Sequence, residues 1–240
     1  MIENYYTSQK TKLMKDFERA SGWYRPHLAE RYGQKVADVV KNMARSEYES
    51  LIPHIPYIGG AKVHMTSDLL ESVLQLAYLR VLRADGKTAE ESRDIVLQAM
   101  KTRLAQYPRL LLRLLGWWAF SKSSIGQLQR QSKESHKREY PDGFVFDVVI
   151  GDGKEFDWGL DFKECGICKF YQAQNAAEFL PLVCPLDYVL SDAFGYGLVR
   201  TKTLAEGDDS CNPRMKRGRP TGWRLSSELR TSGTENRVSH

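Results

Sequence analysis

The spacing of apolar residues changes partway along the chain, and this change constrains the fold more than any other feature. Up to about Gln131, apolar residues recur three or four positions apart, as they do in helices that bury one face. From residue 143 they alternate with polar residues, in the runs 144–150 and 156–162. A Gly-Asp-Gly turn at 151–153 separates these runs and predicts an antiparallel hairpin. The sequence therefore predicts an α+β protein, in which a helical N-terminal half packs on a small antiparallel sheet formed by the C-terminal third.

Capping residues place two helix starts in the first half. Pro26 suits the first turn of a helix, because the N–H that proline lacks would have no partner there. Thr88 is followed three positions later by Glu91, the pattern of a capping box, which predicts a helix beginning just after Thr88. Both residues are thus expected to begin helices.

An unusually apolar run follows Pro108. It covers residues 110–120, includes two tryptophans, and lies next to Arg109 and contains Arg113. The run is shorter than the roughly 20 apolar residues that a membrane-spanning helix needs. We expect a helix buried in the core.

The domain organisation follows from composition. No linker rich in Pro, Gly or Ser interrupts the middle of the chain, so residues 1–213 are predicted to form one α+β domain, with a helical part at 1–138 and a sheet-containing part at 143–213. Residues 214–240 contain seven Lys or Arg and two Asp or Glu, which accounts for the whole net charge of +5. This segment is rich in polar residues and is predicted to be a disordered basic tail. It lacks the basic and aromatic interleaving of a nucleic-acid-binding arm.

The sequence predicts a cytoplasmic protein. It contains no run of eighteen uncharged apolar residues, and its N-terminus lacks a charged segment followed by an apolar one. We therefore expect neither a membrane nor a nucleic acid among its partners, and a small-molecule substrate instead. The oligomeric state does not follow from the sequence.

The four cysteines are the residues best suited to chemistry. They are too few and too clustered for a secreted disulfide framework, so they are expected to be reduced thiols. Two readings stay open for them as a group. The C-x2-C spacing of Cys165 and Cys168 suits a zinc knuckle, which Cys184 and Cys211 would complete as an alternative metal site. Otherwise the chain needs no cofactor, and some of these thiols are small buried apolar groups.

Cys184 is the best candidate nucleophile on local grounds. If Pro185 occupies the first position of a helix over 186–194, Cys184 becomes its cap residue. The positive end of the helix dipole would then lower the pKa of the thiol and favour the reactive thiolate. The acidic turn at 206–209 is expected to be either a hydrogen-bonded loop or the source of a general base.

Three strings in the C-terminal part carry a family resemblance: CPLDY at 184–188, GLVRTKTLAEG at 197–207 and CNPR at 211–214. Together with ECGICKF at 164–170, and more weakly IPYIGG at 55–60, they resemble the L-2-amino-thiazoline-4-carboxylic acid hydrolase family. The resemblance covers most of the chain except the tail.

The resemblance implies a hydrolytic opening of an aminothiazoline ring, which gives a carbamoyl-cysteine. Such a reaction needs attack on an amidine-like carbon, a proton for the departing ring atom and an anchor for the substrate carboxylate. Carried over by position, the candidate residues comprise a catalytic and a substrate-binding group. The catalytic group is Cys184 as nucleophile, Asp187 as acid or base, and Cys168 and Cys211 as pocket thiols; the substrate-binding group is Arg200, Thr203, Arg214 and His64.

One departure from the family pattern affects these assignments. Where the family has Cys-Asp-Phe-Arg, this chain has Asn212 and Pro213 between Cys211 and Arg214. The change removes a carboxylate, and the proline is expected to break strand pairing at that residue. Two further functions are therefore considered: a non-hydrolytic cyclisation, isomerisation or ring opening in small-molecule biosynthesis, and a small-molecule or zinc-binding sensor.

Overall fold

The computed structural model describes residues 5–222 and confirms the α+β class. Within the described residues the helices are α1 (Tyr5–Ser8), α2 (Lys10–Tyr32), α3 (Gln34–Leu51), α4 (Thr66–Ala84), α5 (Ala89–Ala105), α6 (Arg109–Trp118), α7 (Lys122–Ser135), α8 (Gly166–Ala173), α9 (Leu180–Val183) and α10 (Leu186–Phe194). The strands are β1 (Val145–Ile150), β2 (Trp158–Glu164), β3 (Tyr196–Val199) and β4 (Arg214–Arg217). Short 3-10 helices cover Ile52–His54, Gly60–Lys62, Ala177–Phe179 and Leu204–Glu206.

The chain divides into two compact units, each assembled from separate segments. The first unit contains Met1–Tyr107, Tyr140–Gly143 and Gly166–Leu186, and the second contains Pro108–Glu139, Phe144–Cys165 and Asp187–His240. The first is helical, whereas the second holds the sheet together with α6, α7 and most of α10. The single domain expected for residues 1–213 stays a prediction.

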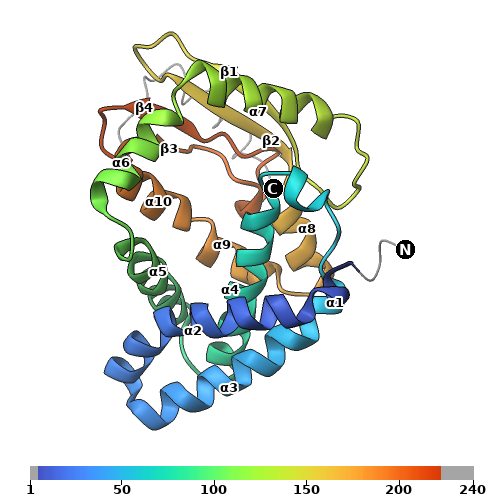
Figure 1. Cartoon of the computed structure of the whole chain (residues 1–240), viewed down its shortest axis with the longest axis vertical. Coiled ribbons are helices and arrows are strands. Elements are labelled where there is room, and N and C mark those ends of the chain that lie inside the picture. Colours follow the sequence, from blue (N-terminus) through green and yellow to red (C-terminus); the bar gives the residue numbers. More distant parts are fainter. Residues whose placement is uncertain (1–4, 223–240) are drawn as a thin grey trace, which may run out of the picture. The chain divides into compact units, whose positions relative to one another are not determined.

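The first unit is organised around α4, which contacts α3, α5 and α8 (Figure 1). Tyr78 of α4 is fully buried and stacks against Tyr24, with ring centroids 3.8 Å apart, and against Phe17 at 5.8 Å. Its hydroxyl donates to Ser21 Oγ at 3.0 Å, so the polar end of the ring is satisfied inside the core. Tyr171 of α8 is equally buried and donates to the Ser72 carbonyl at 2.8 Å, which fixes α8 against α4.

The two predicted helix starts have different outcomes. The capping box is confirmed: Thr88 Oγ1 accepts from the Glu91 N–H, and the Glu91 carboxylate accepts from the Thr88 N–H. The prediction for Pro26 is wrong, because Pro26 lies inside α2. The break between α2 and α3 falls at Gly33, where a φ of 86° favours glycine.

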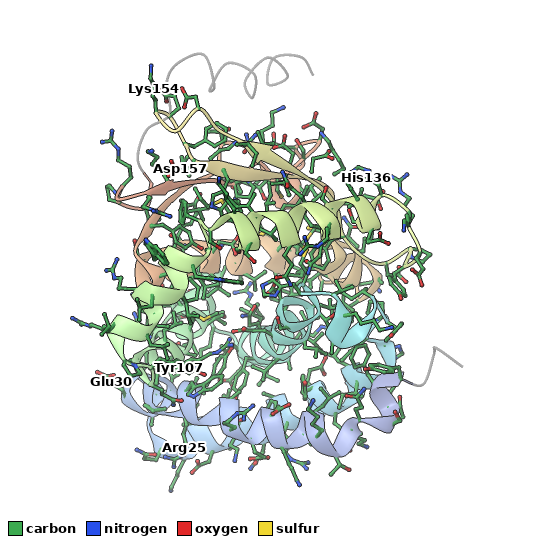
Figure 2. The ribbon with its side chains drawn as sticks, turned by 45° about the horizontal axis from the view of Figure 1, so that its top comes forward. Arg25, Glu30, Tyr107, His136, Lys154 and Asp157 are labelled. Atoms are coloured by element: carbon green, nitrogen blue, oxygen red, sulfur yellow. The ribbon has the colours of Figure 1, made fainter. Side chains whose placement is uncertain are left out.

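The second unit is built on a four-stranded antiparallel sheet in the order β1-β2-β4-β3. The predicted hairpin is present as β1 and β2, and Asp152 closes its turn by accepting the N–H groups of Lys154 and Glu155. Figure 2 shows Lys154 at the tip of this hairpin. The hairpin places residues 158–164 in the middle of the sheet, next to β4.

Helix α7 packs along β1 (Figure 1). Ser132 Oγ donates to the Phe146 carbonyl at 2.8 Å, and His136 contacts Asp147 at 2.8 Å at the end of the helix. The polar segment that begins at Ser121 is therefore helical over Lys122–Ser135, with Ser121 as the cap.

The predicted start of the tail is wrong. Arg214–Arg217 forms β4, which pairs with β2 on one side and β3 on the other, so the sheet continues beyond residue 213. The excess of basic residues concealed a strand whose β2 partners, Trp158 and Gly159, lie 57 and 55 positions earlier in the chain. Residues 223–240, the last part of the predicted tail, lie outside the described residues.

The expectation of a buried core helix after Pro108 is also wrong. Only Leu112 and Gly116 of α6 are buried, whereas Leu110 is 72% exposed and Trp117 is 62% exposed. A Cβ on Gly116 would come within 2.0 Å of the Phe194 carbonyl oxygen, so α6 approaches the end of α10 backbone to backbone. This contact is made by the side of α6 that carries Gly116, and it leaves the other leucines and both tryptophans of the helix exposed.

Candidate active site

The four cysteines are divided between the two units. Cys168 in α8 and Cys184 after α9 belong to the first unit, whereas Cys165 and Cys211 belong to the second. They form no disulfide with one another. Within residues 5–222, no three or more His, Cys, Asp or Glu side chains are grouped so that they could hold a metal ion.

Cys184 does not cap a helix in the way its sequence neighbours suggest. It has helical backbone angles and ends α9, where its N–H donates to the Leu180 carbonyl at 3.1 Å. Helix α10 begins two residues later, at Leu186. The expected N-cap position is therefore wrong, and a C-terminal helix end does not favour a thiolate. Cys165 is the cysteine that immediately precedes a helix, because α8 begins at Gly166.

His64 lies in the first unit, in the turn before α4, and its side chain is exposed. Its carbonyl accepts the Ser67 hydroxyl at 3.0 Å. The remaining predicted residues, Asp187, Arg200, Thr203, Cys211 and Arg214, all belong to the second unit.

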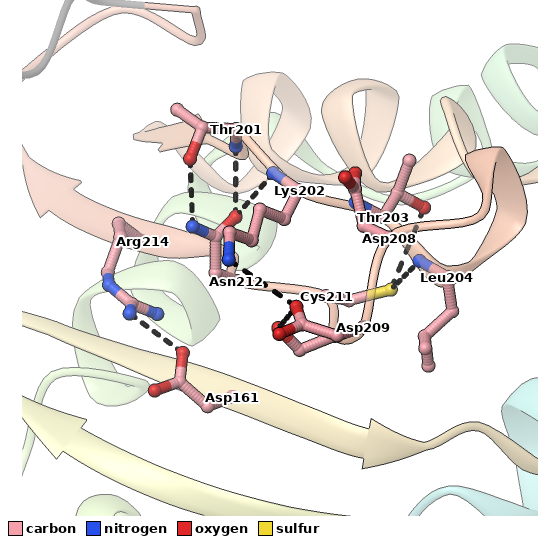
Figure 3. Close-up of polar contacts among 11 residues, drawn as sticks. Asp161, Thr201, Lys202, Thr203, Leu204, Asp208, Asp209, Cys211, Asn212 and Arg214 are labelled. Atoms are coloured by element: carbon pink, nitrogen blue, oxygen red, sulfur yellow. Dashed lines mark hydrogen bonds and ion pairs between the residues drawn. The ribbon is translucent and has the colours of Figure 1, made fainter. Parts of the chain in front are cut away.

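Cys211 and Thr203 are the centre of a polar cluster in the second unit (Figure 3). The Cys211 thiol accepts from the Leu204 N–H at 3.1 Å and donates to Thr203 Oγ1 at 3.6 Å. Cys211 is only 8% exposed, and its backbone pairs with Phe162 of β2 in both directions. Strand pairing and the start of the 3-10 helix at Leu204 therefore fix the position of the sulfur.

The environment of Cys211 keeps its thiol protonated. Burial raises the pKa of the Cys211 thiol above its ordinary value, and the nearby Cys165 raises it further. The Leu204 N–H, the Thr203 hydroxyl and Arg200 act in the opposite direction without reversing the shift. Cys211 is consequently suited to binding or proton donation rather than to nucleophilic attack at neutral pH.

The Asn212 side chain hydrogen-bonds to the segment at Thr201 and Lys202. Its side-chain oxygen accepts the N–H groups of Thr201 at 2.9 Å and Lys202 at 2.7 Å, and its amide nitrogen donates to Thr201 Oγ1 at 2.8 Å (Figure 3). An aspartate at this position could accept the same two N–H groups, while the Thr201 hydroxyl rotates to donate. The residue that differs from the family pattern therefore fixes the backbone of Thr201 and Lys202.

Pro213 interrupts the strand pairing, as expected: β4 begins only at Arg214, and Cys211 and Phe162 form an isolated bridge. The Pro213 carbonyl accepts the Leu160 N–H at 3.0 Å, in register with the pair formed by Cys211 and Phe162. The N–H that proline lacks would have pointed at the Leu160 carbonyl. Arg214 Nη1 donates to that carbonyl at 2.9 Å, so a side chain replaces the missing backbone donor.

The Arg214 guanidinium hydrogen-bonds to other groups of the protein. Besides Leu160, its Nη1 reaches the Pro213 carbonyl at 3.3 Å, and its Nη2 donates to Asp161 Oδ1 at 2.7 Å. Gly159 leaves space for it, because a Cβ there would meet Arg214 Cδ at 2.6 Å. Arg214 thus joins β4 to β2.

Arg200 and Asp187 form an ion pair near α10. Arg200 Nη1 lies 3.0 Å from Asp187 Oδ2, with Arg200 9% exposed and Asp187 55% exposed in their side chains. Crowding by neighbouring atoms raises the pKa of the Asp187 carboxyl and Arg200 lowers it, with a net upward direction. Because solvent reaches more than half of this side chain, the effect of crowding is limited. The pair places a carboxyl group that can exchange protons with solvent beside a nearly buried cation.

The acidic turn after Thr203 is mainly structural. Asp208 Oδ2 accepts the Thr203 N–H at 2.8 Å and closes the turn. Hydrogen bonds from Ser210 and Lys202 lower the pKa of the Asp209 carboxyl, which makes it a weak base. The earlier suggestion that this turn supplies a general base is not favoured.

Sequence reasoning missed the partners that hold this cluster. Asp161 lies 53 positions before Arg214, and no local pattern joins them. The Asn212 contacts with Thr201 and Lys202 were equally hidden, because they join residues 11 and 10 positions apart.

Fold and site together define an α+β protein with a cysteine-containing polar site beside an antiparallel sheet. The sequence profile described as L-2-amino-thiazoline-4-carboxylic acid hydrolase matches residues 68–215, more than half of the chain and all of the polar cluster. The chain belongs to this family. Comparison with curated proteins gave no significant match, and comparison with solved structures gave none either.

Proposed function

We propose that this protein is a hydrolase-like enzyme that opens the ring of a small heterocyclic, sulfur-containing carboxylate of the aminothiazoline type. The observation that carries the proposal is that the family match includes the whole segment from Asp187 to Arg214, which supplies an ion pair and a fixed thiol within one unit. The fold alone does not define a substrate, so the proposal rests on this site.

The reaction adds one molecule of water to the ring. The water oxygen bonds to the amidine-like carbon between nitrogen and sulfur, and one ring bond at that carbon breaks. The departing atom takes up a proton, and the carbon becomes the carbonyl of a carbamoyl group. If the carbon–sulfur bond breaks, the product carries a free thiol; if the carbon–nitrogen bond breaks, it carries an amine.

Arg200 and Asp187 suit two of the required roles. A guanidinium matches the geometry of a carboxylate, and Arg200 is nearly buried, where such an interaction is strong. Asp187 is exposed beside it, so its carboxyl can exchange protons with solvent, which suits a group that takes up and returns protons. We assign Arg200 to anchoring the substrate carboxylate and Asp187 to proton transfer.

The thiols take different parts in this proposal. Cys211, held by Leu204 and Thr203, lines the site as a protonated thiol, and Thr203 offers its hydroxyl for substrate binding. Cys184 and Cys168 belong to the first unit, and their expected parts as nucleophile and pocket thiol stay predictions outside this mechanism, in which water attacks the ring carbon. Single Cys-to-Ser variants at 165 and 184 decide whether either thiol attacks the substrate, because loss of a nucleophile abolishes turnover while the protein stays folded.

Steady-state kinetics of two variants test the assignments. Arg200→Gln should raise KM for the aminothiazoline carboxylate about 10–100-fold, the loss expected for one charged hydrogen-bonded contact. Asp187→Asn should lower kcat about 10²–10⁴-fold with a smaller change in KM. Arg219→Gln is the matched control, because Arg219 is an exposed arginine of the same unit.

Circular dichroism and thermal melting of each variant separate loss of activity from loss of folding. A folded Arg200→Gln variant with unchanged KM would remove Arg200 as the anchor. A folded Asp187→Asn variant with unchanged kcat would remove the proton-transfer role.

A further inference from the structure

The outward side of α6 is an apolar surface that the proposed reaction does not use. We call it the α6 outer face, and it consists of six side chains that are 43–72% exposed: Leu110, Leu111, Leu114, Leu115, Trp117 and Trp118. At 100° per residue these six positions fall within one continuous arc of about 160°. The buried residues of α6, Leu112 and Gly116, lie on the opposite side.

Contacts within the second unit hold α6 in this orientation. Gly116 allows the helix backbone to approach the Phe194 carbonyl, as described above. Arg113 lies over Gly195, where an added Cβ would come within 2.6 Å of the guanidinium carbon. Because glycine at both contact points fixes one side of the helix, the other side is presented outward as a defined surface.

Positive charge lies along one edge of the α6 outer face. Residues 108–133 contain five Lys or Arg and no Asp or Glu. Arg113 lies about 40° beyond the Trp117 edge of the arc, and Arg217 of β4 lies 5.8 Å from the Trp117 ring and 5.1 Å from the Phe120 ring. A partner for this surface must therefore offer an apolar region to the leucines and tryptophans and negative charge to the neighbouring arginines.

We propose that the α6 outer face docks on an anionic lipid surface. An interfacial helix of this kind buries leucines and tryptophans at the level of the lipid headgroups while its basic residues contact acidic headgroups. Tryptophan in particular favours this boundary, where its ring is apolar and its N–H is hydrated. None of the described helices is long and apolar enough to cross a membrane, so the association is with the surface alone.

A second copy of the chain fits this surface poorly. An antiparallel two-fold dimer built on the α6 outer face would bring Arg113 and Arg217 of both copies toward each other. No carboxylate within residues 108–133 is available to neutralise them. Like charges brought together in an interface are unfavourable, whereas acidic headgroups neutralise the same arginines.

Co-sedimentation of the full chain with vesicles tests the proposal. Vesicles of phosphatidylcholine mixed with phosphatidylglycerol should bind the protein, and vesicles of phosphatidylcholine alone should bind it much more weakly. Replacing Arg113 and Arg217 by Gln should weaken binding to the mixed vesicles about 5-fold for each arginine. Raising the salt concentration should weaken it further.

Two hydrophobic variants separate the α6 outer face from exposed apolar residues in general. Leu114→Ser with Trp117→Ser should abolish vesicle binding. Val39→Ser with Met43→Ser, at exposed positions of α3, is the matched control and should leave binding unchanged. Thermal melting of all variants verifies that they are folded.

Three results would overturn the proposal. The first is equal binding to both kinds of vesicle or to neither. The second is a control pair that loses binding as fully as the α6 pair. The third is a lipid-free dimer, seen by sedimentation equilibrium, that the α6 pair dissociates, because it would assign the surface to a second copy.

Discussion

Asn212 illustrates how a single residue can depart from a family pattern without removing a reacting group. Its amide holds two consecutive backbone N–H groups, of Thr201 and Lys202, and a third contact goes to the Thr201 hydroxyl. All three contacts shape the segment that leads to Thr203. The position therefore supports the site through the backbone.

We predict that Asn212→Asp keeps both stability and turnover close to those of the unchanged protein, because a carboxylate accepts the same N–H groups. Asn212→Ala should lower the free energy of unfolding by about 1–3 kcal/mol, since it leaves two N–H groups without their acceptor. Chemical denaturation and steady-state kinetics of both variants check this. An Asp variant with greatly increased turnover would instead mean that a carboxylate at 212 takes part in the reaction.

The four thiols should differ in their reactivity toward iodoacetamide in the native protein. Cys168 and Cys211 are buried, whereas Cys165 and Cys184 are partly exposed. We predict that mass spectrometry after brief labelling at neutral pH finds Cys165 and Cys184 modified first. Because burial raises the pKa of the Cys211 thiol, its labelling should lag until the pH is well above the ordinary range for cysteine. Early labelling of Cys211 at neutral pH would contradict its assignment as a protonated thiol.

At the residue scale, sequence could identify candidates but not their partners. The family strings brought attention to Arg200, Cys211 and Arg214, and all three lie in the polar part of the second unit. The role of Arg214 depended on Asp161 and the Leu160 carbonyl, both of which reach it through sheet pairing. The pairing register between distant strands cannot be predicted from the local sequence.

At the scale of elements, the sequence predicted a helix start correctly where all the interacting residues lie within a few positions of one another. The capping box of α5 involves only Thr88 and Glu91 and was predicted correctly. The prediction of a helix start at Pro26 was wrong because a long helix tolerates a proline when tertiary packing stabilises the rest of it. Helix α2 buries Phe17, Tyr24 and Leu28 in the first unit. The burial of α6 was misjudged because apolar content alone does not say which side of a helix finds a partner.

The capping box makes a quantitative prediction. Thr88→Ala removes the oxygen that accepts the Glu91 N–H, and it should lower the free energy of unfolding by about 1 kcal/mol. Thr11→Ala, at an exposed position within α2, is the control and should have little effect. Denaturant titration measures both. A loss no larger at Thr88 than at Thr11 would show that the capping box adds nothing to stability.

At the scale of the whole molecule, the change from helical to alternating spacing predicted the class correctly. The first unit is helical, and the second contains a small antiparallel sheet. The end of the sheet was placed too early, because β4 is rich in basic residues and lies where composition suggested a tail. Strand β4 is stabilised by two neighbouring strands, and its own sequence gives little sign of this.

The family match and the polar cluster lead to one central claim, that the protein opens an aminothiazoline ring with water. The most direct test is to incubate the purified full chain with L-2-amino-thiazoline-4-carboxylic acid and to follow the product by mass spectrometry and thiol titration. The account predicts a carbamoyl-cysteine that carries one added water, formed by the unchanged protein and by Arg219→Gln but far more slowly by Arg200→Gln. Recovery of the substrate unchanged, or conversion to an isomer without added water, by a folded protein would contradict it.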